Sequence, residues 1–99
     1  MLQISNLHGK DMIMTVKELK QFFNEHLVPS KLYALRGGHH KNRICLGKTS
    51  DGWELYFSDK KQKIGLMHFK TENEACQKMK EEILKIMEQV YGMTWRNLA

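Results

Sequence analysis

The chain has 99 residues, of which 41% are hydrophobic and 27% charged, with one Pro and seven Gly. This length predicts a single domain, residues 1–99, with one modest core and little room for a deep enclosed active site. No run approaches the roughly 20 apolar residues that span a bilayer, and the N-terminal stretch lacks a basic segment followed by an apolar core. We therefore expect a cytoplasmic protein with no membrane partner.

The formal net charge of +5 is concentrated in the middle of the chain. Residues 30–70 carry nine Lys and Arg against three Asp and Glu, whereas residues 1–29 are balanced and residues 71–99 are slightly acidic. A local excess of positive charge predicts a partner that is acidic where it meets this segment.

The N-terminal part of the chain predicts one helix. Residues 1–14 mix apolar and polar residues and fit either a short edge strand or a loosely held arm. Thr15 and Glu18 have the spacing of a capping box, and apolar residues recur behind them at helical intervals. We expect this helix to end before Pro29, because the residue preceding a proline is disfavoured in a helix.

The middle of the chain predicts a meander of strands. Residues 31–35 form a short strand candidate, and the polar, glycine-bearing residues 37–42 are expected to reverse the chain. Residues 43–57 hold two alternating apolar runs joined by Ser-Asp-Gly, which indicates a β-hairpin whose turn tolerates positive φ. After a basic turn at residues 58–63, residues 64–69 form a further strand candidate. The inward-facing positions of the hairpin are expected to be Ile44, Leu46, Trp53, Leu55 and Phe57.

A second helix follows the strands. Thr71 and Glu74 repeat the capping-box spacing, and an apolar stripe continues to about Tyr91, where Gly92 is well placed to end the helix. Residues 93–99 form a C-terminal tail. The order is α-β-β-β-β-α. We predict an α+β fold in which two helices pack on one face of an antiparallel meander sheet of three to four strands. The opposite sheet face, with Arg43, Cys45, Glu54 and Tyr56, is then expected to lie in water.

The residue types that carry catalysis do not form a recognisable constellation, so we expect no enzyme and no cofactor. His39 and His40 are adjacent in a loop, point in different directions and have no Cys or carboxylate at ligand spacing, so no metal is expected. Cys45 and Cys76 occupy strand and helix packing positions and are expected to be reduced core residues.

The basic middle segment has a second interpretation, as an RNA-binding module. Its lysines lie near aromatic residues, and the element order is similar to that of a double-stranded-RNA-binding domain. Such domains open their second helix with a basic cluster that contacts phosphates, whereas this helix opens with Thr71-Glu72-Asn73-Glu74. A subunit of a larger assembly, docked through Trp95 and the tail, is a further alternative.

A spaced pattern across about residues 28–80 resembles a known family. Its most specific blocks are R-I-C-L at residues 43–46 and D-G-W-E-L-Y-F at residues 51–57, with K-T-E-N-E-A-C at residues 70–76. The pattern is similar to small immunity proteins of bacterial contact-dependent inhibition and related polymorphic toxin systems. It departs from that family at Gly47, where an acidic residue is usual, and at Lys60-Lys61, where an Arg-Gly pair is usual.

The resemblance implies a protein that binds a cognate toxin domain, most simply a nuclease, and neutralises it by stoichiometric occlusion. Many immunity proteins against nucleases are acidic, so a basic one is expected to meet an acidic patch of its toxin. Tyr56 and Arg43 are the expected anchors, because Tyr and Arg dominate binding hot spots. The predicted partner-binding residues are Arg36, His39, His40, Lys41, Arg43, Tyr56, Lys60, Lys61 and Lys63.

Overall fold

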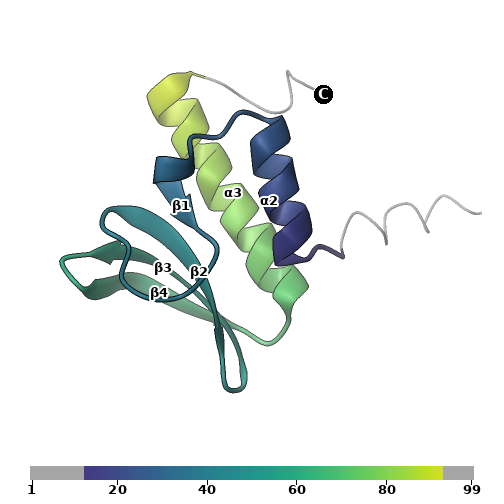
Figure 1. Ribbon diagram of the computed structural model, residues 1–99, viewed down its shortest axis with the longest axis vertical. Helices are drawn as coiled ribbons and strands as arrows, with labels where there is room; N and C mark the ends of the chain where they lie inside the picture. Colours follow the sequence, from purple (N-terminus) through teal and green to yellow (C-terminus); the bar gives the residue numbers. More distant parts are fainter. Residues whose placement is uncertain (1–12, 93–99) are drawn as a thin grey trace, which may run out of the picture.

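The computed structural model describes residues 13–92, and Figure 1 shows how their helices and strands are arranged. Ile13 and Met14 lead into the first of these helices without forming a strand, while residues 1–12 and the tail at 93–99 lie outside the described range. No helix within residues 13–92 is long and apolar enough to cross a membrane. In chain order the elements are α2 (Val16–Glu25), the 3₁₀ helix η1 (Ser30–Leu32), β1 (Tyr33–Ala34), β2 (Arg43–Thr49), β3 (Gly52–Asp59), β4 (Gln62–Phe69) and α3 (Glu72–Tyr91).

The fold has the predicted α+β class and element order, but one strand pairing differs. The sheet order is β1-β2-β3-β4, and the β2–β3 and β3–β4 pairs are antiparallel. β1 instead pairs in parallel with β2, with Tyr33 opposite Ile44 and Ala34 opposite Cys45, so the sheet is mixed. Parallel strands normally need a crossover of about a dozen residues or more. Here the eight residues 35–42 are enough, because β1 is only two residues long and the connection has a short distance to return along it.

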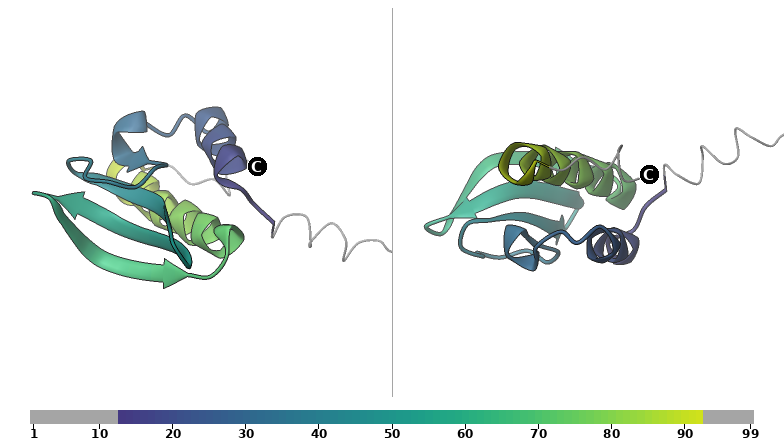
Figure 2. Two further views of the ribbon diagram at one scale, coloured as in Figure 1. Left: turned by 60° about the horizontal axis from the view of Figure 1, so that its bottom comes forward. Right: turned by 90° about the horizontal axis from the view of Figure 1, so that it is seen from above.

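The core lies between the helices and one face of the sheet. α3 crosses this face and α2 packs alongside α3 (Figures 1 and 2). Ile44, Leu46, Trp53 and Leu55 contribute to the core as predicted. Phe57 is 38% exposed, because the ends of β3 and β4 extend past the part of the sheet that α3 covers (Figure 2). The buried helix residues of the core are Leu19, Phe23, Ala75, Cys76, Met79, Ile83 and Met87.

Both helices begin at the predicted capping boxes. In each box the threonine side chain accepts a hydrogen bond from the third backbone N–H of the helix, and the glutamate at that position accepts one from the threonine N–H. α3 ends at Gly92, whose φ of 68° is the left-handed conformation typical of this position. α2 ends less favourably, because Leu27 adopts φ 57° at its C-terminus and is 79% exposed.

The first turn of α3 also caps α2. The Glu72 carboxylate accepts a hydrogen bond from the Val16 N–H at 2.8 Å, and the Asn73 amide oxygen accepts one from the Met14 N–H at 2.8 Å. The bond to Val16 satisfies one of the donors that a helix start leaves without an intrahelical partner, and the bond to Met14 holds the segment that leads into the helix. The starts of the two helices are therefore joined by direct polar contacts.

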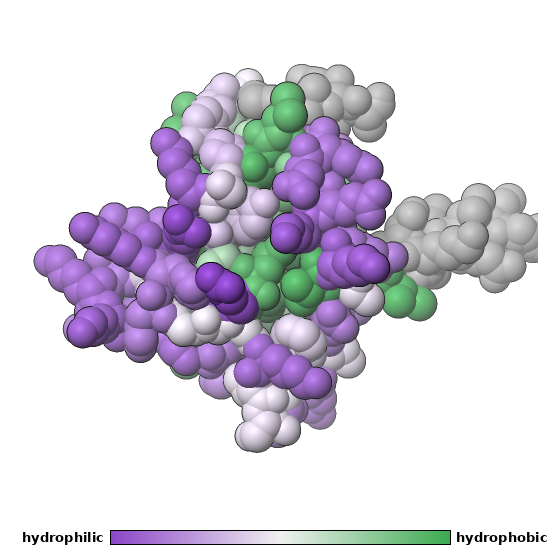
Figure 3. All heavy atoms as spheres, viewed as in Figure 1, coloured by the Kyte–Doolittle hydropathy of each residue, from purple (hydrophilic) through white to green (hydrophobic). Residues whose placement is uncertain are grey.

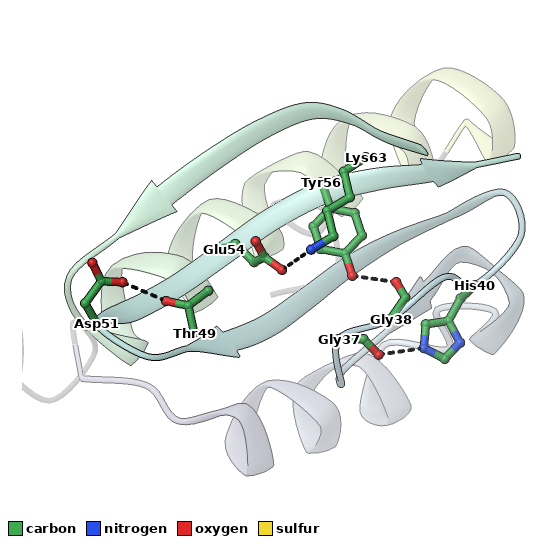
Figure 4. Close-up of polar contacts among 8 residues, drawn as sticks. All are labelled: Gly37, Gly38, His40, Thr49, Asp51, Glu54, Tyr56 and Lys63. Carbon is green, nitrogen blue, oxygen red and sulfur yellow. Dashed lines mark hydrogen bonds and ion pairs between the residues drawn. The ribbon is translucent and has the colours of Figure 1, made fainter. Parts of the chain in front are cut away.

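The second face of the sheet is partly covered, which corrects the expectation that it lies in water. Residues 35–42, which we call the β1–β2 connection, cross this face instead of reversing the chain (Figure 4). Gly47 lets the connection approach β2 closely, since a Cβ at this position would lie 2.9 Å from the Gly37 Cα. On the same face, Cys45 is 0% and Tyr56 1% exposed. The prediction of an exposed Tyr56 is therefore wrong.

The two hairpin turns differ from their predicted chemistry. Positive φ is absent from Ser50, Asp51 and Gly52. Glycine is required at position 52 for space, because a Cβ there would collide with the Phe69 carbonyl oxygen. Positive φ occurs instead in the β3–β4 turn, at Lys60 (49°) and Lys61 (64°). Two consecutive residues of positive φ are characteristic of a type I′ turn, which usually carries Asn-Gly.

Candidate functional site

Three hydrogen bonds join the β1–β2 connection to β3, and one of them runs from the Asn42 N–H to the Ser58 carbonyl oxygen at 2.8 Å. A fourth bond lies within the connection, and Figure 4 shows the bonds at Gly37 and Gly38. The Tyr56 hydroxyl donates to the Gly38 carbonyl oxygen at 2.6 Å, and the His40 backbone N–H donates to the Ser58 hydroxyl at 3.1 Å. The His40 ring nitrogen Nε2 lies 3.0 Å from the Gly37 carbonyl oxygen, and it carries the hydrogen because that oxygen can only accept. These bonds fix the backbone of the connection and the His40 ring.

A cleft of about 470 Å³ lies between α2 and the connection, and we call it the α2 cleft. α2 supplies Lys17 and Lys20, the connection supplies Arg36 and His40, and β2 supplies Arg43 from its first position. No Asp or Glu lines the cleft, and these five side chains form no ion pair with another residue of the described range. Positive charge concentrated in this way attracts anions. The other lining residues are Val16, Asn24, Ser30, Tyr33, Ala34 and Leu35.

A second basic hollow, of about 280 Å³, lies at the β3–β4 turn, and we call it the turn hollow. His39 and Lys41 reach it from the connection, and Lys60 and Lys61 from the turn, with Ser58 as the remaining lining residue. In Figure 3 hydrophilic side chains dominate the left end of the molecule, where Figure 1 places the β3–β4 turn. The connection therefore presents basic side chains to two separate hollows.

The structure brings seven of the nine predicted binding residues into these hollows and leaves two outside. The α2 cleft contains Arg36, His40 and Arg43, and the turn hollow contains His39, Lys41, Lys60 and Lys61.

Tyr56 and Lys63 belong instead to the covered sheet face. The Lys63 ammonium lies 2.7 Å from the Glu54 carboxylate and 4.8 Å from the centroid of the Tyr56 ring (Figure 4). The hydrogen bond to Glu54 raises the pKa of Lys63. Lys63 therefore neutralises Glu54 above the tyrosine ring and adds no unpaired charge to either hollow.

The cysteines are unsuited to nucleophilic chemistry. Both thiols are buried, and neither forms a disulfide. Burial raises the pKa of Cys45, and burial followed by the charges of Glu72 and Glu18 raises the pKa of Cys76 to about 12. Both are protonated at neutral pH, and the thiolate is the reactive form. Within residues 13–92, no group of three or more His, Cys, Asp and Glu is arranged to hold a metal ion.

Sequence reasoning missed Lys17 and Lys20. The net charge of residues 1–29 is zero, because Glu18 and Glu25 offset the charges of these two lysines. The signal was their spacing of three positions, which places both on one side of a helix. Which segment that side would face depends on the path of the β1–β2 connection.

Together, the fold and the two hollows define a small α+β domain with two basic hollows on its surface. Comparisons with protein-family models, with curated proteins and with solved structures give no match to this chain.

Proposed function

We propose that the protein is an immunity protein that binds a cognate toxin domain, in the simplest case a nuclease, and occludes it stoichiometrically in the cytoplasm. The turn hollow carries this proposal. Four basic side chains from two distant segments, His39 and Lys41 with Lys60 and Lys61, converge there without an acidic neighbour in the lining. Recognition of an acidic patch on another protein needs such charge complementarity and requires no chemistry from the inhibitor.

The surface around the turn hollow is preorganised, which favours tight binding. The connection is bonded to Tyr56 and Ser58, and the two turn lysines are set by the hairpin register. A loop already held in its bound conformation loses less entropy on association than a free one. The hydrogen bonds that fix the connection are therefore made within the protein, and the basic side chains of the turn hollow are the groups that contact the toxin.

The start of α3 argues against a double-stranded-RNA-binding function. Glu74 takes part in the helix capping box, and Glu72 is bonded to the Val16 N–H. The RNA-binding domains of similar element order place basic residues at this helix start, whereas carboxylates there would repel phosphates. A protein partner is the better-supported reading of the basic surface.

The direct experiment is co-expression with the product of the neighbouring reading frame, followed by affinity purification and measurement of association rates. Lys60→Glu with Lys61→Glu should slow association about tenfold or more at low ionic strength, because opposite charges steer encounter. Lys48→Glu with Lys70→Glu is the matched control, since these exposed lysines lie outside both hollows and carry the same charge change.

Equal slowing by the two double variants would show that only net charge matters and would remove the turn hollow from the interface. Gel-shift assays with bulk RNA at low salt test the alternative. RNA binding that weakens steeply with salt, together with no binding of the neighbouring product, would replace the immunity function with an RNA-binding one.

A further inference from the structure

The α2 cleft has the features of a small-molecule site that is separate from the turn hollow. Its volume of about 470 Å³ is within the range of about 300–1,000 Å³ typical of ligand pockets. Apolar side chains of Val16, Ala34 and Leu35 line it together with the basic ones. Figure 3 shows apolar surface framed by hydrophilic side chains in the region between α2 and the sheet. A hollow of this size and composition accommodates more than a single inorganic ion.

The charge of the cleft indicates a polyanion. The cleft gathers four basic side chains, and each of them lacks an ion pair within the described part of the chain: Lys17, Lys20, Arg36 and Arg43. Bringing four cations around one hollow costs electrostatic energy that a bound anion would offset. A ligand with three or four negative charges would match this set most closely.

The types of basic residue favour phosphate groups. Arg36 and Arg43 come from the two ends of the segment that borders the cleft, and guanidinium groups bind phosphate oxygens in a bidentate manner. Lys17 and Lys20 face them from α2 as point charges. Arg43 is partly buried, which reduces screening by solvent around its charge.

Polar and aromatic neighbours complete the cleft. Asn24 and Ser30 add uncharged hydrogen-bonding groups to its lining. Tyr33, 8% exposed, and Ala34 are buried lining residues on β1, so the cleft has an apolar floor beside its charged walls. This combination suits a compound in which linked phosphates are attached to an organic group.

We propose that the α2 cleft binds an oligophosphate, meaning a compound with two or three linked phosphate groups such as a nucleoside triphosphate. Lys17 and Lys20 contact it from α2, and Arg36 and Arg43 from the opposite wall. This site does not depend on the proposed immunity function, because the turn hollow uses a different set of side chains.

Isothermal titration calorimetry with tripolyphosphate and with ATP, at low salt and without divalent metal, tests the proposal. Both probes should bind one to one, and at least tenfold more tightly than orthophosphate. Lys20→Gln with Arg36→Gln should weaken the binding of both at least tenfold, because these exposed side chains leave the core intact. Lys60→Gln with Lys61→Gln removes the same charge from the turn hollow and should change the affinity less than twofold.

Three results would overturn the oligophosphate site. They are no binding of either probe at millimolar concentration, orthophosphate binding as tightly as tripolyphosphate, or equal weakening by the cleft and turn variants. Amide chemical-shift mapping with tripolyphosphate provides a second readout. It should show the largest changes in residues 16–24 and 35–43, and changes centred on the β3–β4 turn would contradict the cleft. Because toxin binding is measured with the turn variants, either proposal can fail without the other.

Discussion

Replacing Tyr56 by Phe tests whether the β1–β2 connection is fastened to the sheet. The substitution keeps the ring, which is 1% exposed, and removes only the hydroxyl that donates to the Gly38 oxygen at 2.6 Å. A net intramolecular hydrogen bond contributes about 0.5–1.5 kcal/mol. Gly38 is exposed, so water can replace the lost donor, and we expect a loss of about 1 kcal/mol. For a domain of this size that corresponds to a melting temperature lower by about 4–8 °C.

Urea unfolding and amide hydrogen exchange provide the measurements. The free energy of unfolding should fall as stated, and the His40 amide, which is bonded to the Ser58 hydroxyl, should exchange faster in the variant. Tyr91→Phe is the matched control, because Tyr91 is 41% exposed on the last turn of α3 and should leave the stability unchanged.

Unchanged stability of Tyr56→Phe together with weaker toxin binding would refute this reasoning. Tyr56 would then be an exposed contact residue, as the sequence alone predicts, and the connection would not cover the sheet in solution. A loss of stability with toxin association unchanged at saturating protein would place Tyr56 beneath the interface, as the structure has it.

Three further predictions concern backbone strain and buried thiols. Lys60→Asn with Lys61→Gly should raise the free energy of unfolding in urea by about 1 kcal/mol. Left-handed backbone costs an ordinary residue about 1–2 kcal/mol, and glycine recovers only part of that cost. Lys60→Gln with Lys61→Gln removes the same charges and should leave the free energy of unfolding unchanged. Leu27→Gly should raise the melting temperature for the same reason, and a decrease would show that its side chain packs. Folding raises the pKa of Cys76 from 9.0 to about 12, so its contribution to stability is present below pH 9 and is lost as the pH rises toward 12. Stability measured from pH 8 to pH 11 should therefore fall less steeply in Cys76→Ala than in the native chain.

The helices were predictable because their signals are local. Each capping box lies within four consecutive residues, and the Gly92 terminator directly follows the last turn of α3. The inward face of the hairpin was also predictable, since alternation places Leu46 and Leu55 on the same side.

The path of the β1–β2 connection was not predictable from local patterns. A polar, glycine-bearing loop indicates a chain reversal as well as it indicates a return across the sheet. The sequence signals were Cys45, a residue type that is usually buried, and the glycine at position 47, whereas a tyrosine such as Tyr56 fits either environment. The candidate site was likewise predictable only where its signal is local. The basic residues of the middle segment were predicted, whereas Lys17 and Lys20 join them only through tertiary packing.

The polar contacts between the two helix starts have a consequence for the order of folding. α2 has ten residues, and a helix of that length is marginal in water on its own. Two of its N-terminal bonds come from side chains 56 and 59 positions further along the chain. During synthesis α2 and its own capping box therefore leave the ribosome long before Glu72 and Asn73 do, and we expect α2 to become stable only after α3 has formed and docked. The N-terminal helix would then be stabilised last, by Glu72 and Asn73 of the C-terminal helix.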